Sequence, residues 1–488
     1  MPPQPSSHIV IGQITSATTF DPYLHDEEST YSTLAHFYNK LVAFGPDLDV
    51  QPELAVRWEN VTETVWRFYL RPGVVFHDGR PFGSPDVVSS IRRAKEMPNS
   101  TMGYYLQSIR TVHAVSDSTV EVVTNHASPV LLNKLAFVDI VPRDAGGSAI
   151  EHPVGTGPYR FVSGTPGGTV EAERFERYWG PRPAFDRVTI LSLPGNRERA
   201  LAVPSGKADL VARFPEEYWR WGQAQKDVRV LTRTGLAVTM LGFAHDKSSP
   251  FSDVRVRKAI SLAIDSGRIA KHEPMGAGMD QIVPPGVFGY SKALTPFVHD
   301  PEEARRLLRE ADWPKGFETE LLLPESLDSV GREIAVQLAQ VGIRVHPSVV
   351  PWTDFSRQWW QGGNVLVLFS WAAGTGDASD VLDALVHSRH NGYGGFNYFG
   401  YSNPTVDHLI EMSNQTIDFQ KRQKLLDEVM EEVHEDLPLL PIIQFFNLYA
   451  VRSGLDWTPR LDRRVRAFDL HPGNALLQDP AGHRNGSD

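Results

Sequence analysis

Short apolar runs of strand length alternate with helical stretches along all 488 residues, and this alternation is the strongest constraint on the fold. Runs of about four to eight apolar and β-branched residues are typical of strands. Their alternation with amphipathic helical segments predicts a mixed α/β protein. The expected strands cover residues 9–14, 65–70, 120–124, 188–193, 228–232, 320–323 and 365–369.

Helix starts are predicted where a capping residue precedes proline. In Ser84-Pro85-Asp86, serine can cap the helix, proline fits its first turn, and aspartate faces the positive end of the helix dipole. The same chemistry recurs at Asp300-Pro301, where Glu303 would complete a capping box, and at Asn403-Pro404. No repeat of about 20–50 residues and no flexible linker is visible, so several closely packed domains should exchange the chain more than once.

Composition excludes several function classes. The chain carries 48 basic and 59 acidic residues, a net charge of −11, so nucleic acid and anionic lipid are not expected partners. The absence of cysteine excludes thiol catalysis, iron–sulfur clusters and disulfides. The longest apolar stretch, 365–373, is shorter than the roughly 20 residues that cross a bilayer. The first residues lack the features of a signal peptide, which indicates a cytosolic protein or one whose export signal is absent from the sequence given.

The sequence carries none of the common catalytic or metal-binding motifs. The chain has no G-x-S-x-G elbow, Walker loop, H-E-x-x-H motif or dinucleotide fingerprint. His387 and His390 have H-x-x-H spacing, but no third ligand is evident at a compatible spacing in the sequence. We therefore expect no enzyme, no cofactor and no metal site.

Trp371 is the most informative aromatic residue. It follows the apolar run 365–369 and precedes the small, polar run 372–377. A strand that delivers a flat aromatic ring into a glycine-rich loop predicts one wall of a ligand cleft. A core tryptophan before an ordinary turn is an equally compatible interpretation.

A series of short motifs runs nearly end to end along the chain, and their order and spacing together are highly specific. The motifs are F-D-P at 20–22, Y-N-K-L-V at 38–42, F-Y-L-R-P-G-V at 68–74, F-H-D-G-R-P-F at 76–82, P-V-G-T-G-P-Y at 153–159, Y-W-G at 178–180, D-V-R-V-R-K-A-I at 253–260, P-P-G at 284–286 and Y-S-N-P at 401–404. In these motifs the chain resembles the extracellular solute-binding proteins of family 5, the large peptide and nickel type that serves ABC importers.

The resemblance implies a bilobed α/β protein of the periplasmic-binding-protein type II, large peptide-binding class, with an extra inserted domain. Residues 1–43, 156–240 and 446–488 would form a discontinuous lobe I, residues 44–155 the inserted domain II, and residues 241–445 lobe III. The ligand would lie between the lobes. Closure would bury it and present a surface to a membrane permease.

The resemblance also implies a function. The protein would capture a small peptide-like solute, or one bearing amine, amide or aromatic groups, and deliver it to the permease of an ABC importer. It would act as a monomer at the periplasmic or extracellular face of the membrane, touching the membrane only through the permease or a removed anchor. Nickel or metal-chelate binding on the same fold is the alternative, and a secreted hydrolase is a more distant one.

One position departs from the peptide-binding relatives, in which an aspartate three residues after a tryptophan anchors the ligand's α-amino group. Here that position is Gly374, and 371–378 resembles the T-G-[DE]-A variant of glutathione-type binders. Because a buried ammonium group needs a partner, ordinary peptide capture is not expected at this position. The acidic loop 26–28 is a candidate for the missing acceptor, and a solvated turn that opens a helix is its alternative. The expected ligand-binding residues are Asp26, Glu27, Glu28, His245, Trp371, Gly374, Thr375, Gly376 and Asn397.

Overall fold

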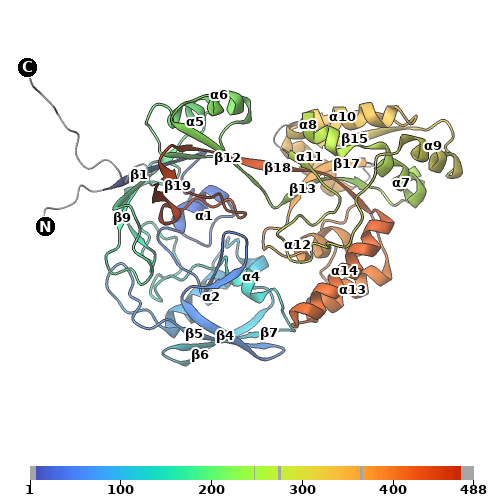
Figure 1. Cartoon of the computed structure of the whole chain (residues 1–488). Coiled ribbons are helices and arrows are strands. Elements are labelled where there is room, and N and C mark those ends of the chain that lie inside the picture. Colours follow the sequence, from blue (N-terminus) through green and yellow to red (C-terminus); the bar gives the residue numbers. More distant parts are fainter. Residues whose placement is uncertain (1–6, 247, 273–275, 363–365, 474–488) are drawn as a thin grey trace, which may run out of the picture. The chain divides into compact units, whose positions relative to one another are not determined.

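The computed structural model divides the chain into two compact units, each of which mixes helices and strands (Figure 1). The described residues are 7–246, 248–272, 276–362 and 366–473. Unit 1 comprises residues 1–126, 131–233 and 447–488, and unit 2 comprises residues 127–130 and 234–446. The α/β class predicted from the sequence is confirmed. Val365, the first residue of one expected strand, lies outside the described residues.

The main sheet of unit 1 has β1 at its centre. This strand runs parallel to β10 on one side and to β11 on the other. Antiparallel strands extend the sheet, with β9 and β8 beyond β10 and the end of β18 beyond β11. The bounds are β1 His8–Gln13, β8 Tyr159–Gly164, β9 Val170–Arg174, β10 Arg187–Ser192, β11 Leu210–Ala212, β12 Val228–Thr234 and β18 Leu439–Arg452, with helices α1 Glu28–Leu34, α5 Asn196–Ala202 and α6 Trp219–Gln223.

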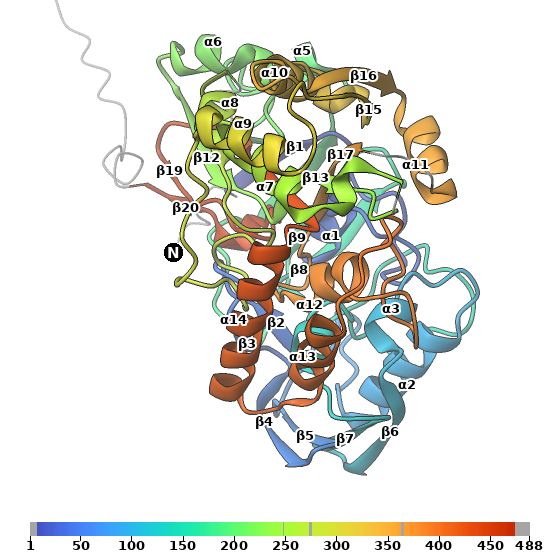
Figure 2. The ribbon, with the colours of Figure 1, turned by 90° about the vertical axis from the view of Figure 1, so that its right-hand side faces the viewer.

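A second, four-stranded antiparallel sheet in unit 1 has the order β4-β5-β7-β6. Helix α2 packs against β6 and β7 (Figure 2). This sheet falls within residues 44–155, and the division of the chain into three domains stays a prediction. The bounds are β2 Val42–Phe44, β3 Val50–Pro52, β4 Ala55–Thr62, β5 Val65–Leu70, β6 Ile109–Ser116, β7 Thr119–Thr124, α2 Ser84–Glu96, α3 Gly103–Leu106 and α4 Leu131–Leu135.

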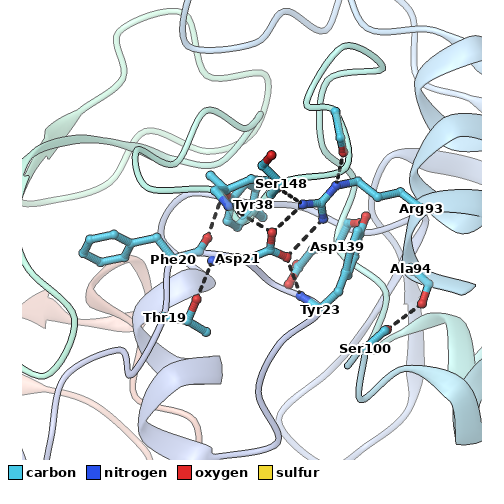
Figure 3. A network of polar contacts seen from close by, with 12 residues as sticks. Thr19, Phe20, Asp21, Tyr23, Tyr38, Arg93, Ala94, Ser100, Asp139 and Ser148 are labelled. Carbon is cyan, nitrogen blue, oxygen red and sulfur yellow. Dashed lines mark hydrogen bonds and ion pairs between the residues drawn. The ribbon is translucent and has the colours of Figure 1, made fainter. Parts of the chain in front are cut away.

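A buried ion pair ties the F-D-P segment to helix α2 (Figure 3). Arg93 donates to both carboxylate oxygens of Asp21, one of them at 3.0 Å. The same carboxylate accepts the backbone N–H groups of Tyr23, at 3.1 Å, and of Ile150, at 3.0 Å. Four donors on one buried carboxylate account for aspartate at this place in the motif, because a buried charge needs partners. The motif therefore has a scaffold role.

The G-T-G motif is shaped by a close approach of backbone to backbone. A Cβ atom on Gly155 would lie 2.1 Å from the carbonyl oxygen of Phe37, and one on Gly157 would lie 2.5 Å from that of His36. His77 joins the two glycines, since its Nδ1 accepts the Gly155 N–H at 3.3 Å and its Nε2–H donates to the Gly157 carbonyl at 3.1 Å. Only glycine fits both positions. Two of the family-like motifs therefore hold one another in place.

Unit 2 is built on a sheet with the order β16-β15-β17-β13-β18. β15 runs parallel to β16 and β17, whereas β13 runs antiparallel to β17 and β18. Helices α13 and α14 lie side by side (Figures 1 and 2). The bounds are β13 Ala237–Phe243, β14 Gly276–Gly278, β15 Glu318–Pro324, β16 Arg344–Val350, β17 Leu366–Ala372, α7 Val254–Ala263, α8 Ser266–His272, α9 Pro301–Glu310, α10 Asp328–Ala339, α11 Trp352–Gln361, α12 Ser379–Val381, α13 Pro404–Gln415 and α14 Phe419–Asp436.

Helices begin at all three predicted sites, but the predicted capping is wrong in detail at two of them. Asp300 accepts two backbone N–H groups of α9, and Asn403 does the same for α13. Glu303 completes no capping box at the start of α9, because its carboxylate pairs with Arg306. Helix α2 is capped by Gly83 instead of Ser84, because Asp86 reaches back to accept the Gly83 N–H at 2.9 Å. None of the helices in the described part of the chain is both long enough and apolar enough to cross a membrane.

Candidate functional site

Trp371 lies near the end of β17, which runs on to Ala372 and so extends three residues beyond the predicted strand. Its indole Nε1–H donates to the carbonyl oxygen of Asp380 at 2.8 Å, which holds one edge of the half-buried ring. The Phe396 ring packs against it, with centroids 4.8 Å apart, and Trp359 meets it nearly at right angles. The result is an aromatic face held in place from two sides.

The loop after Trp371 uses most of its own polar groups. The backbone N–H and the hydroxyl of Thr375 both donate to one carboxylate oxygen of Asp380, at 2.6 and 2.8 Å. Gly376 has a positive φ of 73° and donates its N–H to the Ala373 carbonyl at 3.0 Å. Gly374 is exposed, and a Cβ atom built there meets nothing within 4 Å. The loop therefore presents the Trp371 ring and an open position at Gly374.

A buried ion pair lies beneath this loop. Both terminal guanidinium nitrogens of Arg422 on α14 donate to the Asp377 carboxylate, at 2.6 and 2.7 Å. Burial by itself raises the pKa of this carboxyl, but the Arg422 charge and its hydrogen bonds outweigh burial, and the pKa lies below its ordinary value. The backbone of Phe288 also holds the loop, since its carbonyl accepts the Ala378 N–H and its N–H donates to the Gly376 carbonyl.

Sequence reasoning missed Arg422, although a signal was present. The buried stripe of α14 is formed by residues 426, 429, 430 and 433. Position 422 lies one helical turn before residue 426 and therefore on the same face. A charged residue on an apolar stripe indicates a buried partner of opposite charge. The partner, Asp377, is the acidic residue of the T-G-[DE]-A pattern.

His245 and Asn397 lie elsewhere in unit 2. His245 follows β13, and burial together with the nearby Arg257 charge lowers its pKa to about 4, so that the imidazole is neutral at pH 7. Asn397 is fully buried and clamps its own loop, since its amide donates to the carbonyls of His387 and Tyr401 and its oxygen accepts the Tyr401 N–H. These three hydrogen bonds all join Asn397 to the backbone of this segment.

His245 lines a pocket of about 970 Å³ that is rich in carboxylates, among them Asp246, Glu318 and Glu320. Phe243 of β13 pairs with Leu366 at the start of β17, whereas Ala237 pairs with Ala372 at its end. His245, which follows β13, therefore lies at the opposite end of these strands from the Trp371 loop, roughly 20 Å away along them at about 3.3 Å per residue. The structure brings residues 371–376 together but does not bring His245 to them.

The predicted acidic loop of unit 1 is engaged in local contacts. Asp26 accepts the Tyr31 hydroxyl at 3.2 Å, and Glu27 accepts the hydroxyl of Thr30 at 3.1 Å. Glu28 is the first residue of α1 and forms ion pairs with two arginines, Arg213 at 3.2 Å and Arg463 at 3.1 Å. Asp26 and Glu27 are exposed, and Glu28 is half-buried. A role of these three carboxylates toward a ligand stays a prediction.

Two mixed α/β units, joined by a chain that passes between them more than once, define the class of large periplasmic binding proteins. The solved structure of HbpA2 from Haemophilus parasuis has this fold, with a TM-score of 0.87 at 23% identity over 95% of this chain and 99% of that chain. Residues 49–393 match the family described as "Bacterial extracellular solute-binding proteins, family 5 Middle". The chain belongs to this family of solute-binding proteins, which confirms the resemblance seen in the sequence motifs.

Two curated relatives support the assignment. Heme-binding protein A of Haemophilus influenzae is 27% identical over 466 residues, covering 87% of this chain and 84% of its own. Glutathione-binding protein GsiB of Pectobacterium atrosepticum is 28% identical over 451 residues, covering 88% and 87%. Both relatives are named as binding proteins. Proteins of this family are the periplasmic or extracellular solute-binding components of ABC importers.

Proposed function

We propose that this protein captures a small solute, either peptide-like or bearing amine, amide or aromatic groups, and delivers it unchanged to the permease of an ABC importer. The observation that carries the proposal is the half-buried Trp371 ring, fixed at its edge by Asp380 and bordered by the open position at Gly374. An indole face of this kind stacks on a planar or apolar group of a ligand.

The same loop argues against a free peptide held by its α-ammonium group at this point. Gly374 offers no carboxylate, and the nearest acidic side chains, Asp377 and Asp380, are already engaged by Arg422 and Thr375. The names of the two relatives give heme and glutathione as ligands. Both have planar conjugated or amide groups that an indole can contact, and this supports a solute recognised by stacking.

A thermal-shift screen of the full chain tests the proposal. The probes are glutathione, hemin, di- and tripeptides, aromatic amides and metal chelates. A ligand present at about 100 times its Kd should add about 2.7 kcal/mol of stability. The ligand that stabilises most should then be recovered unchanged after incubation. Turnover above that of a heat-inactivated sample, or no stabilising solute among these classes, would contradict the proposal.

Replacing Trp371 by alanine is expected to weaken binding of that solute by at least about 30-fold. A well-buried aromatic anchor contributes about 2 kcal/mol or more to binding, and each 1.4 kcal/mol corresponds to about tenfold in Kd. Calorimetric titration measures the effect. The matched control is Trp352→Ala, which removes an indole that is 62% exposed on α11 and should leave the affinity unchanged. A Trp371→Ala protein that melts earlier but binds normally would make this tryptophan a core residue only.

Gly374→Asp is expected to weaken the native solute and to create affinity for peptides with a free α-ammonium group. The side chain has room, because nothing lies within 4 Å of the added Cβ. A hydrogen bond to a charged group contributes about 1.5–3 kcal/mol, so the gain for a peptide should be roughly 10- to 100-fold. Gly374→Asn is the control, equal in shape but uncharged. Equal peptide affinities of the two variants would show that the charge plays no part.

A further inference from the structure

Two histidines of one loop and a glutamate of the helix that follows it meet in unit 2. His387 directly follows the helical turn η4 (Leu382–Val386), and His390 lies three residues further on. Glu411 lies on helix α13. One potential ligand atom from each of the three lies within 4.8 Å of the others. The H-x-x-H spacing showed only two ligands in the sequence, and the third is supplied by the fold.

The hydrogen bonding of His387 determines which ring nitrogen is free. This side chain is fully buried, and its Nδ1 lies 2.8 Å from the Ser388 carbonyl oxygen. A carbonyl only accepts, so Nδ1 carries the hydrogen, and in the neutral ring Nε2 then presents a lone pair. Nε2 is buried without a hydrogen-bond partner and lies 3.3 Å from a carboxylate oxygen of Glu411. A lone pair facing a carboxylate oxygen is repulsive, and either a proton or a metal ion between the two atoms removes the repulsion.

Neighbouring groups hold the His387 imidazole, and a carboxylate lies near that of His390. Asp407 accepts the Ser388 N–H at 2.9 Å, and its second oxygen lies 3.6 Å from His390 Nε2. The Tyr393 ring stacks on His387, with centroids 4.2 Å apart and planes inclined by 16°. A carbonyl or carboxylate on the far nitrogen of a histidine is the usual outer-shell partner of a metal ligand.

Two imidazole nitrogens and one carboxylate oxygen suit zinc or a similar first-row transition metal, whereas Ca²⁺ and Mg²⁺ prefer oxygen ligands. Ligand atoms at about 2.0–2.1 Å from a tetrahedral zinc ion lie roughly 3.4 Å apart. Because the ligand atoms of the cluster lie within 4.8 Å of one another, the widest separation would contract by up to about 1.4 Å. This contraction is open to it, because the His390 side chain is 45% exposed and that of Glu411 is 34% exposed.

We propose that His387, His390 and Glu411 bind one zinc ion or a similar divalent transition-metal ion. The site would fasten the segment 387–401 to helix α13. This segment carries Phe396, which packs against Trp371, so a bound ion would stiffen one side of the candidate solute contact. The proposal goes beyond solute binding and stands whether or not a solute is found.

The test uses the full chain, stripped of metal with EDTA, dialysed and titrated with ZnCl₂ in a calorimeter without any solute. One ion should bind per chain. His390→Gln and Glu411→Gln should each weaken binding by at least about 10- to 100-fold, the loss typical even of outer-shell partners. The matched control is His408→Gln, since His408 is exposed on the same helix α13 and lies outside the cluster. It should bind zinc as the unaltered chain does.

Three outcomes would overturn the proposal. The first is the absence of stoichiometric zinc binding, which would leave His387 and Glu411 in contact without an ion between them. The second is equal affinity of both cluster variants and the unaltered chain, which would place zinc among other members of the seventeen histidines. The third is a loss of zinc affinity in His408→Gln that equals the loss in the two cluster variants. Because the variants are exposed or half-exposed at these positions, melting temperatures measured without zinc verify that they fold.

Discussion

Replacing Asp377 by asparagine is expected to destabilise unit 2 by about 3–5 kcal/mol, because removing one partner of a buried ion pair leaves the other charge uncompensated. Asp377 and Arg422 are 2% and 3% exposed, and two hydrogen bonds join them. Asparagine keeps the shape but loses the charge, so the Arg422 guanidinium would remain buried against a neutral amide. The loop of residues 373–378 would lose its anchor to α14.

Urea unfolding followed by circular dichroism measures this effect as a shift of the transition midpoint, which is the appropriate quantity for a chain of two units. Two controls separate burial of charge from loss of packing. Glu303→Gln breaks an exposed pair with Arg306 on α9 and should leave the stability nearly unchanged. The double variant Asp377→Leu with Arg422→Met should lose far less than Asp377→Asn, because no buried charge is left. A loss for Asp377→Asn as small as that for Glu303→Gln would make the pair unimportant.

Local patterns in the sequence were sufficient to predict many of the elements. The strand predicted at 65–70 has those bounds in the structure, and that predicted at 9–14 is displaced by one residue. Both depend on apolar periodicity, which the residues themselves carry. The prediction that the strand before Trp371 ends at Phe369 was too short, because Ser370, Trp371 and Ala372 pair with β13. The pairing partner of a strand is not visible in its own sequence.

In the candidate site, too, adjacent residues could be predicted from the sequence, whereas contacts between distant residues could not. Trp371 and the glycine loop were predicted from adjacent residues, and the structure brings them together. The contacts that hold the loop come from Arg422 and Phe288, which are distant in sequence. Likewise, Glu411 reaches the two histidines only through the packing of α13. The sequence shows which side chains of a segment could bind a ligand. The tertiary contacts decide which of these side chains are already engaged by other residues.

The stability of unit 1 is expected to fall steeply as the pH decreases from about 6.5 to about 4, because three buried histidines resist protonation. Burial lowers the pKa of His25 to about 3, and burial likewise lowers those of His36 and His77 to about 4. Two of the rings are held as neutral tautomers. The Ala467 N–H donates to His36 Nε2 at 2.9 Å, and the Gly155 N–H donates to His77 Nδ1 at 3.3 Å. Protonating either nitrogen would place two donors against each other.

The sign follows from proton linkage. Histidine in the unfolded chain has a pKa of about 6.5, so below that pH the unfolded state binds these protons first and stability declines. Because unfolding takes up three protons, the free energy of unfolding falls by about 4 kcal/mol for each pH unit near pH 5. Glu53 acts in the opposite direction, because burial raises its pKa and the folded state takes up that proton first. One carboxyl offsets part of the loss from three imidazoles, and the stability is highest above pH 6.5.

Urea midpoints for unit 1 at pH 7.5, 6 and 5 measure this dependence. The glutamine of the variant His77→Gln keeps one acceptor for the Gly155 N–H and one donor for the Gly157 carbonyl, but it cannot be protonated. The variant should therefore reduce the pH dependence of the unfolding free energy by about a third. His152→Gln is the control, since His152 is exposed in the same unit and should leave the slope unchanged. The burial argument fails if the midpoint is constant from pH 7.5 to 5, or if His77→Gln and His152→Gln titrate alike. In that case the imidazoles of His36 and His77 must be reached by water and protons without unfolding.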